Sequence, residues 1–534
     1  MKTLIQQFLL FFFTCGAFAQ ISLEHTYNNS AVTRIKLENS GEKCYELKRA
    51  TNELIFYNSD HTLWKTIVLP ADLPNALSPS AKIIHVSESK INPDNNIEIV
   101  FSFYNLSTGK MDCKVYSENG TTLLTIANGT TSSYVSEIPG LADKLIAIGI
   151  TETSVYSIPS LVLENTYNYG NLKRIKLENS GEKYYLLDKV NNNAKIYNQN
   201  HSLWKTVSLP KPSSAIYTNI DVISETQMNP DALLEIGYSY STTANNITQY
   251  EAKIVNENNL VLLTIPNSSR LQISSLEGLQ DKLIAENINN YVYGTSVYNL
   301  PTLSLENVYE SRVTRVKLEN SGEKYYTSLY PLNNQVKVYN SNYTLWKTIN
   351  LPVPFNMLNN AIRVSAFSEN IINPDALIEL AYTYSTGLLS GYEYSSRVIN
   401  ENGDVLLEAE YVQDLYSNEI QGLKNKLIGY NFNPFQNAYI GKVYSLETLG
   451  ITDFNKKSNV FIAPNPAKSF LNINSLISPI IQAKIYNLNG VLVKRETAQN
   501  ITKIDIEKLP AGIYIVNLTD SNNQKSTHKI TVLH

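Results

Sequence analysis

The sequence has little charge, little cysteine and little tryptophan. Only 17% of its 534 residues are charged, and it contains 3 Cys and 3 Trp. Because 43% of the residues are hydrophobic, the low charge excludes a disordered acidic or basic chain. The formal net charge of −4, from 44 basic and 48 acidic residues, gives no electrostatic basis for binding nucleic acid. We therefore expect a folded protein without a nucleic-acid partner.

Long apolar runs and helical periodicity are also missing. After the N-terminal stretch no apolar run reaches the ~18 residues of a spanning helix, so we expect no transmembrane segment. No sustained apolar pattern of period 3.6 is present, so helices should be few. Tyrosine is abundant, with 36 Tyr against 15 Phe, and asparagine is frequent. Tyr favours strands and Asn favours tight turns, so the composition predicts an all-β fold.

The N-terminus has the pattern of a secretory signal peptide. Lys2 precedes an apolar run that is strongest at residues 8–13, and Ala17 and Ala19 form an A-x-A site before Gln20. A basic start, a short apolar stretch and small residues before the cut are typical of a cleaved signal. The pattern predicts a signal peptide over residues 1–19 and an exported mature chain.

Export leaves two cysteines, Cys44 and Cys113, because Cys15 lies within the signal. Both occur only in the first copy of the repeat described next. In an oxidising compartment they can form a disulfide, but two buried free thiols are an equally good interpretation, since the sequence does not give their separation.

One pattern occurs three times along the chain. The ten-residue segment that begins at Arg34 returns at Arg174 and, with Val in place of Ile, at Arg315. Leu-Trp-Lys-Thr recurs at Trp64, Trp204 and Trp346, at steps of 140 and 142 residues. Self-similarity at a fixed period indicates a repeat architecture. We divide residues 20–450 into the copies 20–160, 161–302 and 303–450.

Each copy also contains two similar hairpins, some with Asn-Gly turns such as 119–120 and 402–403. Two hairpins per copy predict six units of about 70 residues, each with room for four strands. We expect these units to form a six-bladed β-propeller. Three tandem β-sandwiches are the alternative. The strand at Leu23 resembles the strands that open the later copies, and none follows the third copy, so we expect it to complete the last blade and close the ring.

The pattern changes after a polar linker at 451–458. Residues 459–534 contain short apolar segments separated by Pro-Asn-Pro, Asn-Gly and Pro-Ala-Gly turns, which predict a small β-sandwich. The order of motifs resembles the type A C-terminal sorting domain of the type IX secretion system of Bacteroidetes-type bacteria. The positions that carry this resemblance are Pro464, Asn465, Pro466, Gly490, Leu509, Gly512, Tyr514 and Lys529. A generic β-sandwich, such as a carbohydrate-binding module, is the alternative.

This resemblance implies a route and a partner. A sorting domain of this family is recognised by the outer-membrane translocon after transit through the periplasm, and is usually removed. The product is then released or attached to the cell surface. The resemblance covers none of the repeat region, so it implies nothing about what that region binds.

The sequence contains no familiar catalytic or metal-binding motif. The six His form no H-E-x-x-H or zinc-spaced cluster, and G-x-S-x-G and phosphate-loop patterns are absent. The prominent carboxylates, such as Glu38, Glu42 and Asp94, recur in every copy, which favours turn chemistry over a single catalytic pair. His61 and His201 occupy equivalent turns. We therefore assign no catalytic residue, metal or cofactor.

Aromatic residues are the remaining binding candidates. The period-2 rule puts Trp204 on the polar face of its strand, opposite Leu203 and Val207, and the same holds for Trp64 and Trp346. Such rings could stack on a sugar, although packing between blades is the favoured interpretation. Arg34, Arg174 and Arg315 are expected to be solvated.

We expect a non-enzymatic binding or adhesion module for an extracellular glycan or protein. The alternatives are a polysaccharide-active hydrolase with its site in the propeller channel and a structural component of the cell envelope. An unrepeated pair of acidic residues in the channel would favour the enzyme.

Overall fold

The computed structural model describes residues 21–28, 31–70, 80–169, 171–244, 246–327, 334–354, 362–373, 375, 377–388, 391–433, 438–446, 460–475, 478–487, 491–521 and 525–533. The signal peptide with Ala17, Ala19 and Gln20, and the linker 451–458, lie outside these residues. The chain divides into two compact units, Met1–Thr448 and Leu449–His534. Within the described residues the regular structure is entirely β-strand, and no helix is long and apolar enough to cross a membrane.

The described part of the first unit forms nine four-stranded antiparallel sheets, which we call blades 1 to 9 in chain order. Blade 1 contains β2 (Val32–Leu37), β3 (Gly41–Lys48), β4 (Glu53–Asn58) and β5 (Leu63–Val68); blade 2 contains β6 (Lys82–Ser87), β7 (Glu98–Asn105), β8 (Lys110–Ser117) and β9 (Thr122–Ala127); blade 3 contains β10 (Tyr134–Ser136), β11 (Lys144–Ile148), β12 (Thr153–Ser157) and β13 (Leu163–Tyr167).

The second group of three repeats this order. Blade 4 contains β14 (Lys173–Leu177), β15 (Gly181–Asp188), β16 (Asn193–Asn198) and β17 (Leu203–Ser208); blade 5 contains β18 (Ala215–Ser224), β19 (Glu235–Ala244), β20 (Ile247–Asn256) and β21 (Val261–Pro266); blade 6 contains β22 (Ser268–Ser274), β23 (Lys282–Asn289), β24 (Val292–Asn299) and β25 (Leu305–Tyr309).

The third group ends with a composite blade. Blade 7 contains β26 (Val313–Leu318), β27 (Gly322–Thr327), β28 (Gln335–Asn340) and β29 (Leu345–Asn350); blade 8 contains β30 (Arg363–Ser368), β31 (Glu379–Leu388), β32 (Gly391–Asn400) and β33 (Val405–Glu410); blade 9 contains β34 (Asp414–Asn418), β35 (Lys426–Asn433), β36 (Ala438–Leu446) and the N-terminal strand β1 (Ile21–Tyr27).

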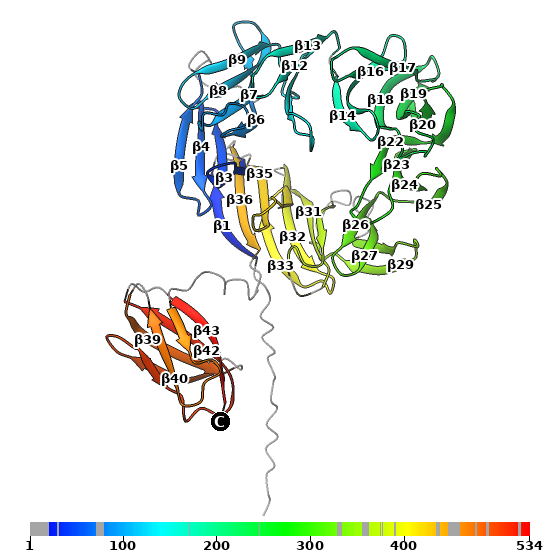
Figure 1. Ribbon diagram of the computed structural model, residues 1–534. Coiled ribbons are helices and arrows are strands. Elements are labelled where there is room, and N and C mark those ends of the chain that lie inside the picture. The colour runs from blue at the N-terminus through cyan, green and yellow to red at the C-terminus, as the bar shows by residue number, and fades with distance from the viewer. Residues whose placement is uncertain are drawn as a thin grey trace, which may run out of the picture. The chain divides into compact units, whose positions relative to one another are not determined.

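The nine blades follow one another around a ring, with the first strand of a blade nearest the centre (Figure 1). The propeller prediction is therefore confirmed, and so is closure by the N-terminal strand, because β1 pairs with β36 in antiparallel register, Ser22 opposite Ser445. The predicted count of six blades is wrong, and the alternative of three tandem sandwiches is excluded by the ring. Each copy contributes three sheets and not two.

A hydrophobic core lies at every junction between blades. The nine clusters of buried apolar residues described in this unit each combine residues of two neighbouring blades. Tyr27 and Val443 of blade 9, for example, pack with Val32 and Cys44 of blade 1. Neighbouring sheets thus cover each other's apolar faces all the way round, which leaves only short sheet edges exposed.

The tryptophan strands depart from simple alternation because each contains a β-bulge. In blade 4, Ile196 pairs with Lys205 but Tyr197 pairs with Leu203, so Trp204 is the extra residue. Because side chains alternate with period 2, one extra residue moves Leu203 to the face opposite Val207. Leu203 is 55% exposed, while Trp204 packs against the cluster between blades 4 and 5. The same bulge occurs at Trp64 and Trp346, so the predicted polar face for these tryptophans is wrong.

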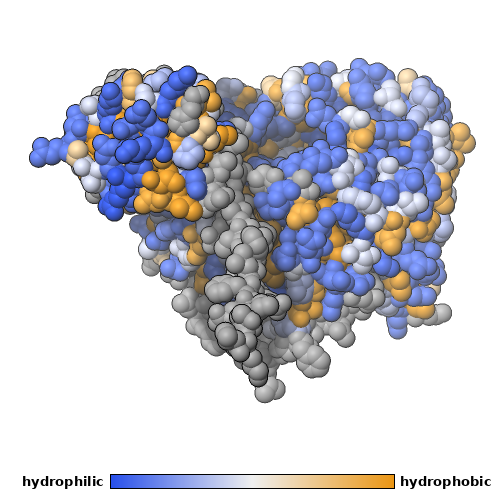
Figure 2. Space-filling view, turned by 90° about the horizontal axis from the view of Figure 1, so that it is seen from below, coloured by the Kyte–Doolittle hydropathy of each residue, from blue (hydrophilic) through white to orange (hydrophobic). Residues whose placement is uncertain are grey.

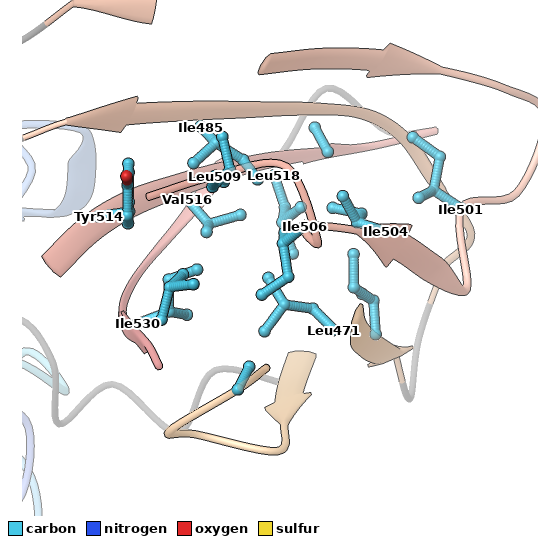
Figure 3. Packing of buried hydrophobic residues seen from close by; sticks show 14 of the residues in the cluster. Leu471, Ile485, Ile501, Ile504, Ile506, Leu509, Tyr514, Val516, Leu518 and Ile530 are labelled. Carbon is cyan, nitrogen blue, oxygen red and sulfur yellow. The ribbon is translucent and has the colours of Figure 1, made fainter. Parts of the chain in front are cut away.

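The second unit is a sandwich of two sheets. One contains β37 (Val460–Ala463), β38 (Phe470–Ser475) and β41 (Lys503–Asp505); the other contains β40 (Leu492–Thr497), β39 (Ile480–Asn487), β42 (Gly512–Asp520) and β43 (Lys525–Val532). A single core cluster joins them, with Leu471 and Ile504 from the first sheet against Ile485, Val516 and Ile530 from the second (Figure 3). The two packed sheets agree with the β-sandwich predicted from the sequence.

Candidate functional site

The three tryptophans lie at equivalent junctions and already have cationic neighbours. The ammonium groups of Lys183 and Lys205 lie 4.7 and 4.2 Å from the ring centroid of Trp204. Trp64 has Lys43 and Lys65 at 4.7 and 4.8 Å, and Trp346 has Lys324 and Lys347 at 4.7 and 4.4 Å. Such cation–π contacts stabilise a half-buried indole in place. The geometry favours a packing role for these rings over stacking on a sugar.

The second lysine of each set joins two blades. Lys65 of blade 1 pairs with Glu118 of blade 2 at 2.6 Å, and Lys347 of blade 7 pairs with Glu401 of blade 8 at 2.6 Å. Lys205 and Glu257 form the same ion pair between blades 4 and 5. The repeated Trp-Lys dipeptide therefore fastens one blade to the next.

The repeated arginines are buried, so the prediction that they are solvated is wrong. Nε of Arg174 donates to Glu182 at 2.8 Å, and its Nη atoms donate to the carbonyls of Ser136 and Ala142 in blade 3 at 3.0 and 2.6 Å. Arg315 makes the equivalent bonds to Glu323 and to blade 6. Strand alternation pointed these side chains away from their own core, but the neighbouring blade covers that face.

The repeated Glu-Asn-Ser-Gly turn docks on the following blade. Glu88 accepts hydrogen bonds from the backbone N–H groups of Asn39 and Ser40, both at 2.8 Å, and from the Ser40 hydroxyl. In return Glu38 accepts from the N–H of Glu88 at 2.7 Å. Burial acts to raise the pKa of Glu88, but these hydrogen bonds outweigh it and the pKa is lowered. Glu225 and Glu369 bind the later copies of the turn in the same way.

His61 and His201 are turn residues that also bridge blades. Their φ angles are 65° and 64°, and Tyr343 has 68° at the equivalent position of the third copy. The Tyr167 hydroxyl lies 2.7 Å from Nδ1 of His201, whose Nε2 lies 3.4 Å from Glu164 in blade 3. These contacts support the interpretation of both histidines as structural.

The two cysteines are free and buried. Cys113 packs between blades 2 and 3, and Cys44 between blades 9 and 1. The possible disulfide between them is therefore wrong, and the alternative of two buried thiols holds. Burial raises the pKa of Cys44 to about 11 and that of Cys113 to about 12, so neither thiol is a nucleophile near neutral pH.

An open hollow of about 290 Å³ lies where the inner strands of blades 4 to 6 meet. Its lining consists of Ile175, Tyr185 and residues 221–223 and 270–273. Asp221 is the extra residue of a β-bulge on β18, since Ile220 pairs with Tyr238 and Val222 pairs with Gly237. Bulges often redirect a side chain next to a site.

The charges around this hollow break the threefold repetition. The bulged position holds Asp221 in the second copy but Ile84 and Ser365 in the others. Lys173 corresponds to Thr33 and Thr314, and Arg270 corresponds to Ser132 and Asp414. Lys173 replaces a threonine that the other two copies share, whereas the Asp221 and Arg270 positions hold a different residue in each copy. The set Lys173, Asp221 and Arg270 therefore occurs in the second copy alone. Sequence reasoning missed them, although their departure from the repeat was a readable signal.

Lys173 is electrostatically linked to both Asp221 and Arg270. Asp221 accepts hydrogen bonds from Asn219 at 2.6 Å and from the N–H of Leu271 at 3.1 Å. Burial raises the pKa of Asp221, although these hydrogen bonds and Lys173 act in the opposite direction. Burial has the opposite effect on the pKa of Lys173, which it lowers, because burial disfavours the charged form of both groups. The Arg270 side chain is 61% exposed and its Nη1 lies 4.0 Å from Glu286, so the guanidinium retains free donors toward solvent.

In the second unit, the Pro-Asn-Pro loop is fastened to the last strand. The side-chain amide of Asn465 donates to the carbonyl of Lys529 at 2.9 Å and accepts from the N–H of Thr531 at 2.9 Å. The N–H of Ala467 donates to Thr531 at 2.8 Å. Residues 461–533 match the family model of the secretion system C-terminal sorting domain. The chain ends in a type IX sorting domain. This domain directs the protein out of the cell, to the surface or the medium.

The other motif positions of the sorting domain are mainly structural. Tyr514 and Leu509 are buried in the core, and the Tyr514 hydroxyl donates to the carbonyl of Pro510 at 2.8 Å. Gly512 begins β42. Pro464, Pro466 and Lys529 are exposed, so they are available to a partner. Gly490 lies outside the described residues.

No curated protein matches the chain. Similar solved structures include the Dos1 propeller, with 9% sequence identity and a TM-score of 0.39, where the match covers 80% of this chain and 96% of that one. BamB from Moraxella catarrhalis has 8% identity and a TM-score of 0.36, and the match covers 69% of this chain and 100% of that one. A third is the extracellular domain of a putative hybrid two-component system from B. thetaiotaomicron, with 11% identity and a TM-score of 0.27; the match covers 94% of this chain and 72% of that one. With scores this low, the propeller assignment rests on the strand order of the nine blades.

Proposed function

We propose that the exported ring is a non-enzymatic binding module for an extracellular glycan, and that the hollow on blades 4 to 6 is its binding site. The observation that carries the proposal is that Lys173, Asp221 and Arg270 gather around one hollow, while the equivalent positions of the other two copies hold other residues. The arginines, the tryptophans and the turn glutamates that join neighbouring blades recur in every copy, so a charged set found in one copy calls for a role beyond folding.

The size and chemistry of the hollow favour a sugar over a protein partner. A volume of about 290 Å³ is at the lower end for small-ligand sites and suits one or two sugar units. Arg270, Gln272 and Asp221 offer hydrogen bonds to hydroxyl groups, and the partly exposed side chains of Ile175 and Ile273 offer apolar surface. A protein partner would need a patch of roughly 800 Å². On the face of the molecule in Figure 2, hydrophobic residues are interspersed among hydrophilic ones.

The test uses residues that the other copies already accommodate. Lys173→Thr, Asp221→Ser and Arg270→Ser place at each position a residue that another copy has there, so the fold should tolerate them. Glycan-array screening of the purified protein identifies the ligand, and titration measures its affinity. We expect the triple variant to bind at least tenfold more weakly, about 1.4 kcal/mol, with an unchanged melting temperature.

Asp414→Ser is the matched control, because Asp414 stands in the third copy where Arg270 stands in the second. It should leave the affinity unchanged. Equal binding by the triple variant and the wild-type protein would contradict the proposal, because the ligand would then bind elsewhere.

One observation favours the second candidate, a polysaccharide hydrolase. Asp221 has a raised pKa in a partly buried site, as a general acid requires. Glycoside hydrolysis also needs a second carboxylate flanking the same bond, and the lining of the hollow includes one carboxylate. Release of reducing ends from a bound polysaccharide, lost in Asp221→Ser, would favour the hydrolase.

A further inference from the structure

Three equivalent glutamates are completely buried at the start of a blade's second strand. They are Glu98 on β7, Glu235 on β19 and Glu379 on β31, and each is 0% exposed. Each follows the Asp of an Asn-Pro-Asp turn by four residues: Asp94, Asp231 and Asp375 respectively. The arrangement therefore occurs three times around the ring, in blades 2, 5 and 8.

These carboxyl groups lack the donors that a buried carboxylate requires. Among the described residues, neither oxygen of Glu235 or Glu379 receives a hydrogen bond, and the same is true of Oε2 of Glu98. Oε1 of Glu98 receives one long hydrogen bond, from Ser117 at 3.4 Å. A buried ionised carboxylate without donors is strongly unfavourable.

The Asp of the turn lies within hydrogen-bonding reach of the buried Glu in all three blades. In each turn the Asp itself is held by its own loop. Asp231 accepts from the N–H of Leu233 at 2.9 Å and from the amide of Asn229 at 2.7 Å. The turn therefore presents a fixed carboxylate to the buried glutamate, and two carboxyl groups can bond only through a proton.

The other charged groups that face the buried glutamates are also acidic. Glu178 and Glu257 face Glu235, while Glu319 and Glu401 face Glu379. Glu118 faces Glu98. The nearby lysines are already engaged, since Lys65, Lys205 and Lys347 pair with Glu118, Glu257 and Glu401. Among the described residues, the charged groups that act most strongly on the buried glutamates are thus all acidic.

We propose that Glu98, Glu235 and Glu379 are proton-binding sites, each a neutral carboxylic acid that donates its O–H to the neighbouring Asp, and that the three shared protons make the stability of the ring depend on pH. Burial and the neighbouring Asp raise the pKa of Glu98 to about 8, and those of Glu235 and Glu379 to about 9. A divalent cation is a less suitable occupant, because the described residues contain no group of three His, Cys, Asp or Glu side chains arranged to hold a metal.

The direction of the pH effect follows from linkage. A glutamate in the unfolded chain has a pKa near 4.5, so the folded ring binds more protons than the unfolded chain above that pH. The stabilisation is complete below about pH 4.5, declines as the pH rises, and is lost through pH 8 to 9. Ionisation would then place two carboxylates side by side beside each of three blade junctions, and the exported ring would weaken in alkaline surroundings.

The test measures the melting temperature of the purified full-length protein from pH 6 to pH 10, with and without Glu235→Gln. A glutamine amide donates to Asp231 without a titrating proton. We expect the melting temperature of the wild-type protein to fall across this range. The melting temperature of the variant should fall less, and at pH 9 it should be higher than that of the wild type. The proposal would be overturned if the variant melted lower than the wild type at every pH and its melting temperature declined with pH as steeply as that of the wild type.

A control variant and a direct measurement complete the test. Glu286→Gln breaks the ion pair with Arg312, whose Nη2 lies 3.0 Å from Glu286, and removes none of the groups named above as facing the buried glutamates. It should therefore lower the melting temperature by a similar amount at every pH. The infrared C=O band of a protonated carboxylic acid should be present in the wild-type protein at pH 7, weaken in Glu235→Gln, and vanish in the triple glutamine variant. Absence of this band from the wild type, or a melting temperature that drops on adding a calcium chelator, would overturn the shared-proton assignment.

Discussion

Arg34 and Asn418 are 384 residues apart, yet Nη1 of Arg34 donates to both the backbone carbonyl and the side-chain oxygen of Asn418, at 3.1 Å each. Nη2 donates to the carbonyl of Lys424 at 2.6 Å, and Nε donates to Glu42 at 2.7 Å. The Arg34 side chain is fully buried. One guanidinium thus joins the first blade to the last, at the junction where the ring closes.

We predict that Arg34→Ala lowers the free energy of unfolding by about 3–5 kcal/mol. Removing one partner of a buried ion pair leaves the other charge and two carbonyls unsatisfied. Urea denaturation followed by tyrosine and tryptophan fluorescence measures the change. Arg270→Ser is the control, because the Arg270 side chain is largely exposed and its replacement should change the free energy of unfolding by no more than about 0.5 kcal/mol. A loss for Arg34→Ala no larger than that of the control would contradict the closing role of Arg34.

Trp204→Ala should destabilise the ring by about 3 kcal/mol and leave glycan affinity unchanged. The indole packs on the cluster between blades 4 and 5, and its removal also leaves Lys183 and Lys205 without the ring that they contact. Thermal unfolding and ligand titration of the same sample separate the two effects. A large loss of affinity with little loss of stability would restore the sugar-stacking hypothesis for the tryptophans.

His201→Tyr should make the ring less sensitive to acid. Burial lowers the pKa of His201 from 6.5, although the hydrogen bond to Glu164 acts in the opposite direction. A lowered pKa in the folded state means that the stabilisation is present above pH 6.5 and is lost as the pH falls through the lowered value. The third copy already has Tyr343 at this position, where its hydroxyl donates to Glu306. We expect the variant to lose less stability than the wild type between pH 7 and pH 5 in denaturant titrations. Parallel losses would show that His201 does not contribute to acid sensitivity.

The ring and its closure could be predicted from the sequence because both depend on repeated pattern. The strand at Leu23 resembles those at Leu163 and Leu305, and each of the three is the outermost strand of the blade that precedes its own copy. The first such strand has no preceding blade in the chain, so it pairs with β36 of the last. The sorting domain was equally accessible, because its turn motifs occur in a fixed order at the C-terminus.

The number of blades was missed because the last turn of one blade in three differs from the other two. The third strands of blades 1, 2 and 3 all end alike, in Phe-Tyr-Asn, Val-Tyr-Ser and Val-Tyr-Ser. Blades 1 and 2 then turn through the four polar residues 59–62 or 118–121, whereas blade 3 joins β12 to β13 through the five largely apolar residues 158–162. One third of a 140-residue copy is about 47 residues, which is close to the usual length of a four-stranded blade, whereas 70 is too long.

The tryptophan and arginine errors share a physical cause. Alternation describes one strand within one sheet, and it cannot reveal an inserted residue such as Trp204 or a second sheet that covers the polar face at Arg174. The hollow around Asp221 was missed for another reason. Its charged residues are distinguished by their absence from the other copies, whereas the motifs that stand out in the sequence are those that recur.

The most direct test of the nine-bladed ring is a disulfide across its closure. Ser22 of β1 lies opposite Ser445 of β36, with their hydroxyl oxygens 2.6 Å apart. In the variant Ser22→Cys/Ser445→Cys we expect mild oxidation to join the two positions within one chain. Peptide mass spectrometry should identify the cross-linked pair, and the melting temperature should rise. Two free thiols at these positions in the folded, oxidised protein would show that the N-terminal strand does not complete the ninth blade, and would contradict the closed ring.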